Sequence, residues 1–368
     1  MKTTIFKKNM MQKAVLIAIL LSISCASFPC TSFILRDNNG LFLGKNLDYY
    51  TGRGFVFINQ RNDKKAGACI PPEKPTQWVS KYGSITFNIY GKDLPMSGMN
   101  EKGLVIEDLW LDVTEYPEPD KRKAVPELGW IQYMLDNCST IDEVIEADKH
   151  VRIANTSIAK IHFILLDSTG KSAIIEILNG KTVITKGDSF PIEVIENQTY
   201  AQSLEFMKNN PLGAKSYLQP IIDKRERFEM ISQMIMDKSP NEKPLDFCFN
   251  VLKKVTWTSE NMDAPTQWSI VYDITGRKIS FKTKDNTNIR TISLNDISFQ
   301  CSDTIVTTNI QTNITNLMPE NFHSYTIAEA KLHLRSVYDE VPFTKGRIPD
   351  QMLDEILMVT NKNTCTDL

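Results

Sequence analysis

The sequence has little of what nucleic-acid-binding and metal-binding proteins require. Its 42 lysines and arginines nearly balance 44 aspartates and glutamates, and the net charge of −2 gives no electrostatic basis for binding nucleic acid. The four histidines do not form an HExxH or similar metal motif. Internal repeats, low-complexity tracts and phosphate-binding glycine loops are absent. We therefore expect neither a nucleic-acid partner nor a bound metal.

Cysteine pairs at CxxC spacing are also absent. Six of the seven cysteines lie at or after Cys30, and an exported protein can form disulfides from such residues. We expect most of them to be buried apolar thiols, with room for one disulfide whose partners the sequence does not assign. The mature chain of roughly 340 residues is long enough for one large domain or two ordinary ones.

The first 26 residues have the order of a secretory signal peptide. Basic residues precede an apolar run at 14–23, which is too short to span a bilayer, and a small-x-small site predicts cleavage after Ala26. Residues 27–29 would then remain as a short propeptide. Lipidation of Cys25 is the alternative, but Ser22 stands where a lipoprotein signal has leucine. We expect export to the bacterial periplasm or secretion from the cell.

The first mature segment predicts a β-hairpin over residues 30–48. Two runs of β-forming residues flank an Asp-Asn-Asn-Gly turn. If the turn is centred near Asn39, Cys30 and Asp48 stand opposite each other on one face of the hairpin. Cleavage before Cys30 would give this residue both a thiol and a free α-amine.

An α-amine can serve as the base for a thiol on the same residue. Its unperturbed pKa of about 7.7–8.0 lies close to the thiol value of about 8.5, so no histidine is required. A carboxylate beside the amine, here Asp48, would orient it as the third member of a triad orients its base. The alternative is that Cys30 is a small buried cysteine and that Asp48 caps the following turn.

These residues resemble a known family. The tetrapeptide Cys-Thr-Ser-Phe at 30–33, followed by Gly-Lys-Asn-Leu-Asp at 44–48, is similar to the choloylglycine hydrolase and penicillin V acylase family of N-terminal-nucleophile amidases. Residues 98–104 and 266–273 resemble further family segments, so that the resemblance covers about residues 30–303. It implies a four-layer αββα sandwich. The alternation of strand-rich and helical segments independently favours an α+β class.

The resemblance also implies roles for site residues. The side chain of Asn197 would donate to the oxyanion, and the backbone N–H of Trp110 would be a second donor. Arg227 matches a family arginine near the nucleophile, and Lys45 stands where the family has arginine, with Arg53 as another cation that could replace it in space. The structural alternatives are an Asx turn, a core aromatic residue, a solvated helix face and a solvated strand lysine.

The function that the resemblance implies is hydrolysis of linear non-peptide amides through a Cys30 acyl-enzyme, without a metal or organic cofactor. An aromatic residue at Trp110 favours a penicillin V acylase-like enzyme over a conjugated bile salt hydrolase, which stays the alternative. The substrate would be a small amide with an apolar or aromatic acyl group, and the family implies a homo-oligomer, a tetramer. A different class remains open, an inactive exported binding protein or lipoprotein of the same fold.

Residues 304–368 lie beyond the resemblance. Apolar residues at helical spacing predict helices over 326–338 and 350–359, separated by Pro342 and Pro349. We expect a C-terminal helical extension packed on the core. A dimerisation or partner-binding element is the alternative.

Overall fold

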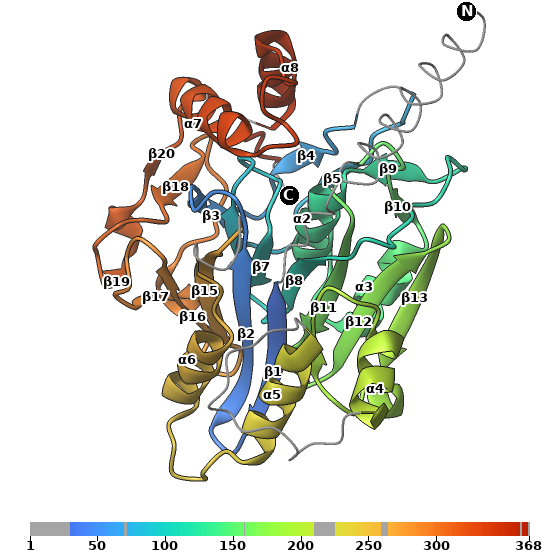
Figure 1. Cartoon of the computed structure of the whole chain (residues 1–368). Coiled ribbons are helices and arrows are strands. Elements are labelled where there is room, and N and C mark those ends of the chain that lie inside the picture. Colours follow the sequence, from blue (N-terminus) through green and yellow to red (C-terminus); the bar gives the residue numbers. More distant parts are fainter. Residues whose placement is uncertain are drawn as a thin grey trace, which may run out of the picture.

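Two β-sheets packed face to face form the centre of the molecule, which we describe from a computed structural model (Figure 1). The structure describes residues 30–69, 72–157, 159–209, 225–258, 264–360 and 363–366. Sheet A has the strand order β14-β1-β2-β15-β16-β17-β19, and sheet B has the order β13-β12-β11-β8-β7-β6-β3-β18-β20. The expected signal peptide, the propeptide and Cys25 lie outside the described residues.

The strands are short to medium in length and mostly antiparallel. Sheet A contains β1 (Thr31–Asp37), β2 (Gly40–Asp48), β14 (Val194–Ile195), β15 (Thr266–Asp273), β16 (Lys278–Thr283), β17 (Arg290–Ser293) and β19 (Asn316–Leu317). Sheet B contains β3 (Phe55–Asn59), β6 (Ser84–Asn88), β7 (Ser97–Asn100), β8 (Val105–Trp110), β11 (Ile161–Leu166), β12 (Ser172–Leu178), β13 (Lys181–Lys186), β18 (Val306–Asn309) and β20 (His323–Ser324). Two small ribbons pair β4 (Lys64–Ala66) with β5 (Gln77–Val79) and β9 (Lys123–Val125) with β10 (Val151–Ile153).

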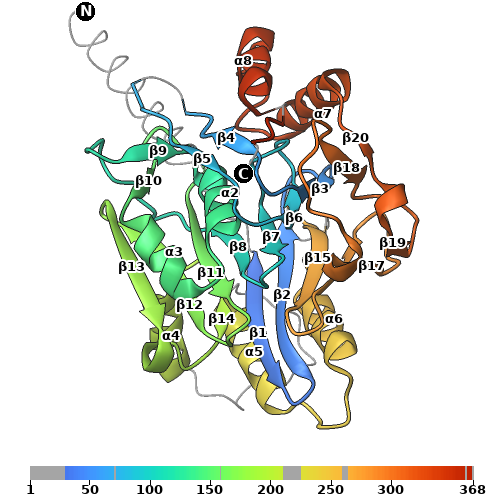
Figure 2. The same ribbon diagram turned by 180° about the vertical axis from the view of Figure 1, so that it is seen from behind.

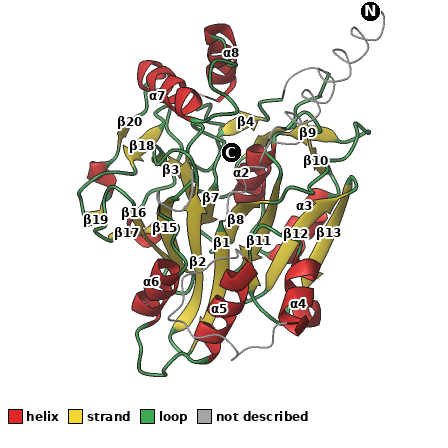
Figure 3. Ribbon diagram, in the orientation of Figure 1, coloured by secondary structure: helices red, strands yellow, loops and turns green. Residues whose placement is uncertain are grey.

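Helices cover the outer faces of both sheets. Helices α5 (Arg225–Met236) and α6 (Pro244–Lys254) pack on sheet A, with α4 (Tyr200–Asn209) beside α5. Figure 2 shows α2 (Glu127–Asn137) and α3 (Ile141–Asp148) on the opposite side, over sheet B. Figure 3 shows the same layers by secondary structure. The predicted α+β class and four-layer αββα sandwich are confirmed.

Local sequence explains several helix ends. Pro244 is the first residue of α6. At this position a backbone N–H would have no hydrogen-bond acceptor within the helix, so proline, which lacks an N–H, costs nothing here. Thr140 precedes α3 and accepts the backbone N–H of Glu143 at 3.3 Å. In α2 the apolar residues recur at helical spacing and bury the face that meets sheet B.

The central strands are buried on both faces because each lies between another sheet and a helix layer. Strand β2 is buried from Phe42 to Asp48, and β8 from Val105 to Leu109. Both strands nevertheless contain charged residues. Since a buried charge is costly unless it is paired, these residues are the first place to look for a functional arrangement.

The hairpin β1–β2 forms as expected, but its register differs from the prediction by one residue. The pairs are Asp37 with Gly40 and Thr31 with Asn46, so the turn is centred between Asn38 and Asn39. The cause is an Asx turn, in which the Asp37 carboxylate accepts the Asn39 backbone N–H at 2.9 Å. A shift of one residue exchanges the faces of the second strand, which decides where its charged residues point.

The C-terminal segment is only partly helical, whereas the sequence pattern predicts helices alone. Before the helices, β18 joins sheet B beside β3, and β19 joins sheet A beside β17. The helices α7 (Ile327–Glu340) and α8 (Asp350–Thr360) follow and pack against each other at one end of the sandwich (Figure 1). The short strands escape prediction because each is too brief to show a period of its own.

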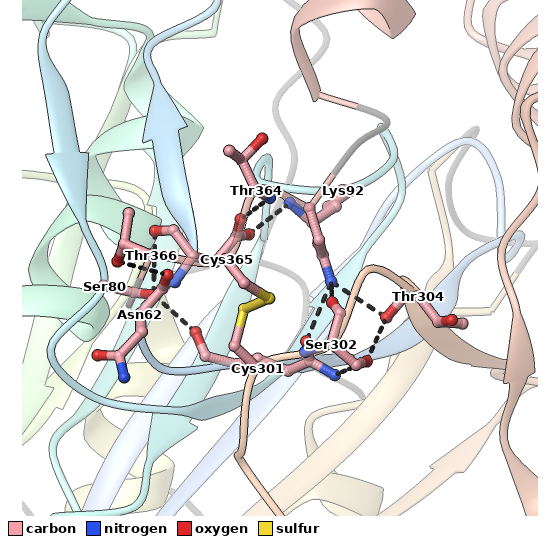
Figure 4. Close-up of a disulfide and its surroundings, with 12 residues drawn as sticks. Asn62, Ser80, Lys92, Cys301, Ser302, Thr304, Thr364, Cys365 and Thr366 are labelled. Atoms are coloured by element: carbon pink, nitrogen blue, oxygen red, sulfur yellow. Dashed lines mark hydrogen bonds and ion pairs between the residues drawn. A yellow bond between two sulfur atoms is a disulfide. The ribbon is translucent and has the colours of Figure 1, made fainter. Parts of the chain in front are cut away.

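A disulfide and several backbone hydrogen bonds attach the end of the chain to the core (Figure 4). Cys301 is bonded to Cys365. Beside it, the Asp63 carboxylate accepts the Thr364 N–H at 2.7 Å, and Lys64 N–H donates to the Thr364 carbonyl at 2.8 Å. The cysteines that are free in the structure are Cys30, Cys69, Cys138 and Cys248, of which only Cys69 is not fully buried.

Among the residues that the structure describes, none of the helices combines the length and apolar character needed to cross a membrane.

The disulfide predicts a loss of stability when it is removed. The bond closes a loop of 64 residues, which restricts the unfolded chain, so replacing both Cys301 and Cys365 by serine should lower the free energy of unfolding by roughly 2–4 kcal/mol. Urea unfolding with and without a reducing agent measures this. Reduction should lower the midpoint of the wild type and leave the double variant unchanged. Equal midpoints for the oxidised wild type and the variant would contradict the prediction.

Candidate active site

Cys30 lies at the start of β1, between the two sheets. Its side chain is 4% exposed, and its Sγ lies 3.7 Å from the backbone oxygen of Asp48. Burial raises the pKa of the thiol to about 12, and the nearby positive charge of Lys45 opposes that shift. The thiol is therefore neutral at physiological pH unless another group takes its proton.

Asp48 lies at the end of β2 on the face that meets the helices. Asn46, on the same face, donates to the backbone of α6 at 2.8 Å, whereas Lys45 points to sheet B. The expectation that Cys30 and Asp48 share a face is therefore wrong, because the register is shifted by one residue. The two residues are still neighbours, but the Asp48 carboxylate lies near the backbone of Cys30 and not on the side of its thiol.

Arg227 connects these two residues. It is fully buried on α5; its Nη1 donates to Asp48 Oδ2 at 3.1 Å and its Nη2 donates to the carbonyl of Cys30 at 2.9 Å. Glu196 lies 3.4 Å from its Nε. A planar guanidinium suits this position because its fork can hold a carboxylate and a carbonyl at fixed separation. Arg227 thus lies in the site that the family resemblance assigned to it, and not on a solvated helix face.

Thr266 completes the surroundings of Asp48. Its hydroxyl donates to Asp48 Oδ1, while Arg227 binds the other carboxylate oxygen. Burial raises the pKa of Asp48 to about 6, and the charge of Arg227 opposes this shift. The carboxylate is held on both oxygens beside the backbone of Cys30, where an α-amine would form after cleavage.

Lys45 bridges the two sheets within the site. Its Nζ lies 2.9 Å from the Glu107 carboxylate and 2.6 Å from that of Asp108, both on β8. Burial raises the pKa of Glu107 to about 7, against the effect of the lysine. Lys45 is not a solvated strand residue. The other cation considered, Arg53, pairs with Glu340 at 2.6 Å on a half-exposed surface and does not replace it.

Asn197 and Trp110, the two residues expected to supply the oxyanion donors, are in contact with each other. Asn197 Nδ2 donates to the Trp110 carbonyl at 2.8 Å. The Leu111 N–H donates to the Lys160 carbonyl, so these two residues form a hydrogen-bonded pair. In an antiparallel ladder such pairs alternate with pairs that are not hydrogen-bonded to each other, and Trp110, opposite Ile161, belongs to the second kind. The N–H and C=O of Trp110 therefore point away from β11. The Trp110 N–H therefore points to the side of β8 on which the Asn197 amide lies.

An apolar cavity of about 160 Å³ adjoins Cys30 and Trp110. Aliphatic and aromatic side chains form most of its wall, among them Leu47, Tyr90, Met96, Leu128, Tyr338 and Phe343. Among the described residues, no group of histidine, cysteine, aspartate and glutamate side chains is arranged to hold a metal ion. The cavity can accept an apolar group next to the Cys30 sulfur.

Several residues of the site are absent from the sequence-based prediction. Thr266 lies in the family-like segment 266–273 without a predicted role, and Glu196 has no predicted role either. A signal for Glu107 and Asp108 is present, because two adjacent acids interrupt a strand that is otherwise apolar. Such acids need a buried cation.

Removing Lys45 predicts a large loss of stability. Lys45→Met would leave the Glu107 and Asp108 carboxyl groups buried without their cation, and we expect the free energy of unfolding to fall by roughly 3–5 kcal/mol. Urea titration followed by tryptophan fluorescence measures the change. Lys171→Met, which removes an exposed lysine paired with Asp142, is the matched control and should leave the midpoint nearly unchanged. Equal midpoints for the two variants would contradict the assignment.

Comparisons with known proteins identify the proteins to which the chain is similar. The sequence profile described as "Linear amide C-N hydrolases, choloylglycine hydrolase family" matches residues 30–211. Penicillin V acylase of Pectobacterium atrosepticum is 26% identical over 324 residues, covering 75% of this chain and 84% of the relative. A bile salt hydrolase/transferase of Clostridium perfringens is 30% identical over an alignment of 161 residues that covers 40% of this chain and 47% of that protein.

A solved structure shows the same fold. Penicillin V acylase from Agrobacterium tumefaciens superposes with a TM-score of 0.65 at 24% identity, covering 81% of this chain and 98% of that one. Sequence profile and relatives together place the protein among the enzymes that hydrolyse linear amide C–N bonds. The chain belongs to the choloylglycine hydrolase family.

Proposed function

We propose that the protein is an exported N-terminal-nucleophile amidase in which Cys30 forms an acyl-enzyme with an apolar or aromatic acyl group. The observation that carries this proposal is the Arg227 bridge, which holds the Asp48 carboxylate beside the backbone of Cys30 at the edge of an apolar cavity. A carboxylate in that position serves an α-amine better than it serves a thiol.

The reaction uses the α-amine of the mature chain as its base. The amine accepts the thiol proton, the sulfur bonds to the amide carbonyl carbon, and the protonated amine then gives that proton to the departing nitrogen as the C–N bond breaks. Water, deprotonated by the same amine, attacks the thioester. The carboxylic acid leaves, and the thiol is restored. Asp48 keeps the amine oriented throughout.

Two N–H groups stabilise the negative charge of the tetrahedral intermediate. Asn197 has two amide N–H donors, of which its contact with the Trp110 carbonyl uses one. The Trp110 N–H lies on the same side of β8. One such donor is worth on the order of 3 kcal/mol of the activation barrier.

The proposed substrate class follows from the cavity and from the relatives. Its apolar and aromatic wall suits a hydrophobic acyl group, and the relatives act, by name, on penicillin V and bile salts. Trp110, an aromatic residue at the cavity, favours the penicillin V acylase-like substrate. A panel of penicillin V, glycine- and taurine-conjugated bile salts and acyl homoserine lactones tests this. Faster hydrolysis of the bile salts would indicate a conjugated bile salt hydrolase in place of a penicillin V acylase-like enzyme.

Export and maturation belong to the same proposal. Cleavage after Ala26 leaves residues 27–29, which Cys30 removes by attacking the preceding carbonyl. A disulfide between Cys301 and Cys365 supports an oxidising compartment, since such bonds persist outside the cytosol. The oligomeric state stays a prediction.

Maturation predicts a defined intact mass. Purified exported protein should begin at Cys30 and hydrolyse amides, whereas Cys30→Ala should keep residues 27–29 and lose activity by at least about 10²-fold, because nucleophile and base are removed together. Mass spectrometry and an amide hydrolysis assay measure both. Cys248→Ala, at another buried thiol, is the control and should mature normally. A fully active chain that begins at Ser27 would contradict the mechanism.

The pKa of Asp48 predicts an acid limb in the pH profile. Burial raises this pKa to about 6, so the residue is charged above that pH and becomes neutral below it. We expect kcat/KM to fall further as the pH decreases through about 6, in addition to the fall that protonation of the amine itself causes, because a neutral Asp48 no longer orients the amine.

Asp48→Asn tests the assignment of that limb. The variant should be slower at every pH by at least about 10²-fold and should lack the limb that Asp48 causes. Asp142→Asn, at an exposed carboxylate, is the control. An Asp48→Asn profile with the same acid limb as the wild type would assign that limb to another group.

A further inference from the structure

The cavity beside Cys30 is closed on one side by the C-terminal segment. Tyr338 at the end of α7, Phe343 and Thr344 in the turn that follows, and Ile356 of α8 all line it. These residues lie more than 300 positions after the nucleophile and beyond the matched range 30–211. The wall is therefore built by a part of the chain that the family profile does not describe.

Aromatic contacts join this segment to the walls nearer the nucleophile. The ring centroid of Phe343 lies 6.5 Å from that of Trp110 and 6.3 Å from that of Tyr50. The Tyr338 ring lies 5.6 Å from that of Tyr90, whose hydroxyl is 2.5 Å from the hydroxyl of Tyr49. Edge and tilted ring contacts at such distances are favourable and fix relative orientation. Phe343 thus faces the residue whose N–H is proposed to bind the oxyanion.

The turn that carries Phe343 is ordered by its own hydrogen bonds. The Thr344 hydroxyl donates to the Tyr338 carbonyl at 3.0 Å, and the N–H of Thr344 and of Lys345 both donate to the Val341 carbonyl, at 3.0 and 2.9 Å. Gly346 has a φ of +69°, a backbone conformation that glycine adopts without strain. A preorganised turn can hold a side chain at a fixed depth in the cavity.

Two further attachments hold the helical pair in place. Leu334 of α7 and Leu353 of α8 belong to an apolar cluster, separate from the main core, that also contains Phe55 and Phe57 of β3. After α8, the Cys301–Cys365 disulfide and the bonds between Thr364 and residues 63–64 fasten the chain end beside β4. The segment is anchored on both sides of the turn at 341–346.

We propose that the α7–turn–α8 segment is the specificity wall of the acyl pocket and that Phe343 limits the length of the acyl group. This inference rests on the proposed function, because it assumes that the cavity receives the acyl side of the amide. A shorter side chain at position 343 extends the cavity away from Cys30, and a larger one shortens it. The chemistry at Cys30, Asp48 and Asn197 is unchanged in either case.

A pair of opposite substitutions tests the wall. In an acyl series from acetyl to dodecanoyl, with phenoxyacetyl as the aromatic member and 4-nitroaniline as the constant amine, Phe343→Ala should shift the optimum of kcat/KM to longer chains. Phe343→Trp should shift it to shorter chains. The selectivity between neighbouring members should change by about tenfold, since one methylene in an apolar pocket discriminates by that order. Leu332→Ala, at a leucine of α7 that is 72% exposed, is the control and should keep the wild-type series.

A binding measurement separates this inference from the proposed function. Calorimetric titration of the free carboxylic acids into the mature protein, with and without each substitution at Phe343, reports the pocket without turnover, because the acids are products of the proposed reaction. Thermal unfolding checks that each variant is folded. A wild type that hydrolyses none of the amides, while the substitutions at Phe343 still change which acyl length binds best, would contradict the proposed function. That result would support the role of Phe343 in the acyl pocket. If Phe343→Ala and Phe343→Trp have the same dependence on acyl length as Leu332→Ala, both in turnover and in binding, the proposed role of Phe343 is wrong.

Discussion

The buried guanidinium of Arg227 is the interaction on which the rest of the site depends. It binds the Cys30 carbonyl and the Asp48 carboxylate at once, so it fixes the start of β1 relative to the end of β2. Without a partner on each side, a fully buried arginine and a fully buried aspartate would each carry a large desolvation cost. The same contact therefore stabilises the fold at this point and places a carboxylate where the proposed mature N-terminus would form.

A second buried charge cluster ties sheet A to sheet B. Lys45 stands between Glu107 and Asp108, and the one-residue register shift of the hairpin makes this contact because it turns Lys45 toward β8 and Asp48 toward α5. The positive charge of Lys45 also opposes the rise in the thiol pKa of Cys30. Lysine serves here as a point charge between two acids, a geometry that does not require the planar fork of arginine.

The sequence predicted the fold class and the closeness of Cys30 to Asp48 because both depend on local patterns. The β-forming runs and the turn residues bring Cys30 near Asp48 whichever asparagine centres the turn, although the register itself followed from an Asx bond that the pattern does not specify. The partners of Asp48 are different in kind. Arg227 and Thr266 lie 179 and 218 residues away, and only a resemblance to relatives drew attention to the first. Phe343 lies outside every matched motif, so no sequence signal places it near Cys30.

Burial of the thiol explains why an α-amine is a suitable base in this site. An apolar environment holds the Cys30 thiol neutral, with its pKa raised to about 12, so a distant or solvated base would gain little thiolate. An amine on the same residue needs no second side chain to be brought into the cavity, and it leaves the cavity wall free to be apolar. Before cleavage that nitrogen is part of an amide and has no basic lone pair. Under the proposed mechanism, cleavage before Cys30 would therefore also create the base, so that the apolar pocket would be built first and become reactive afterwards.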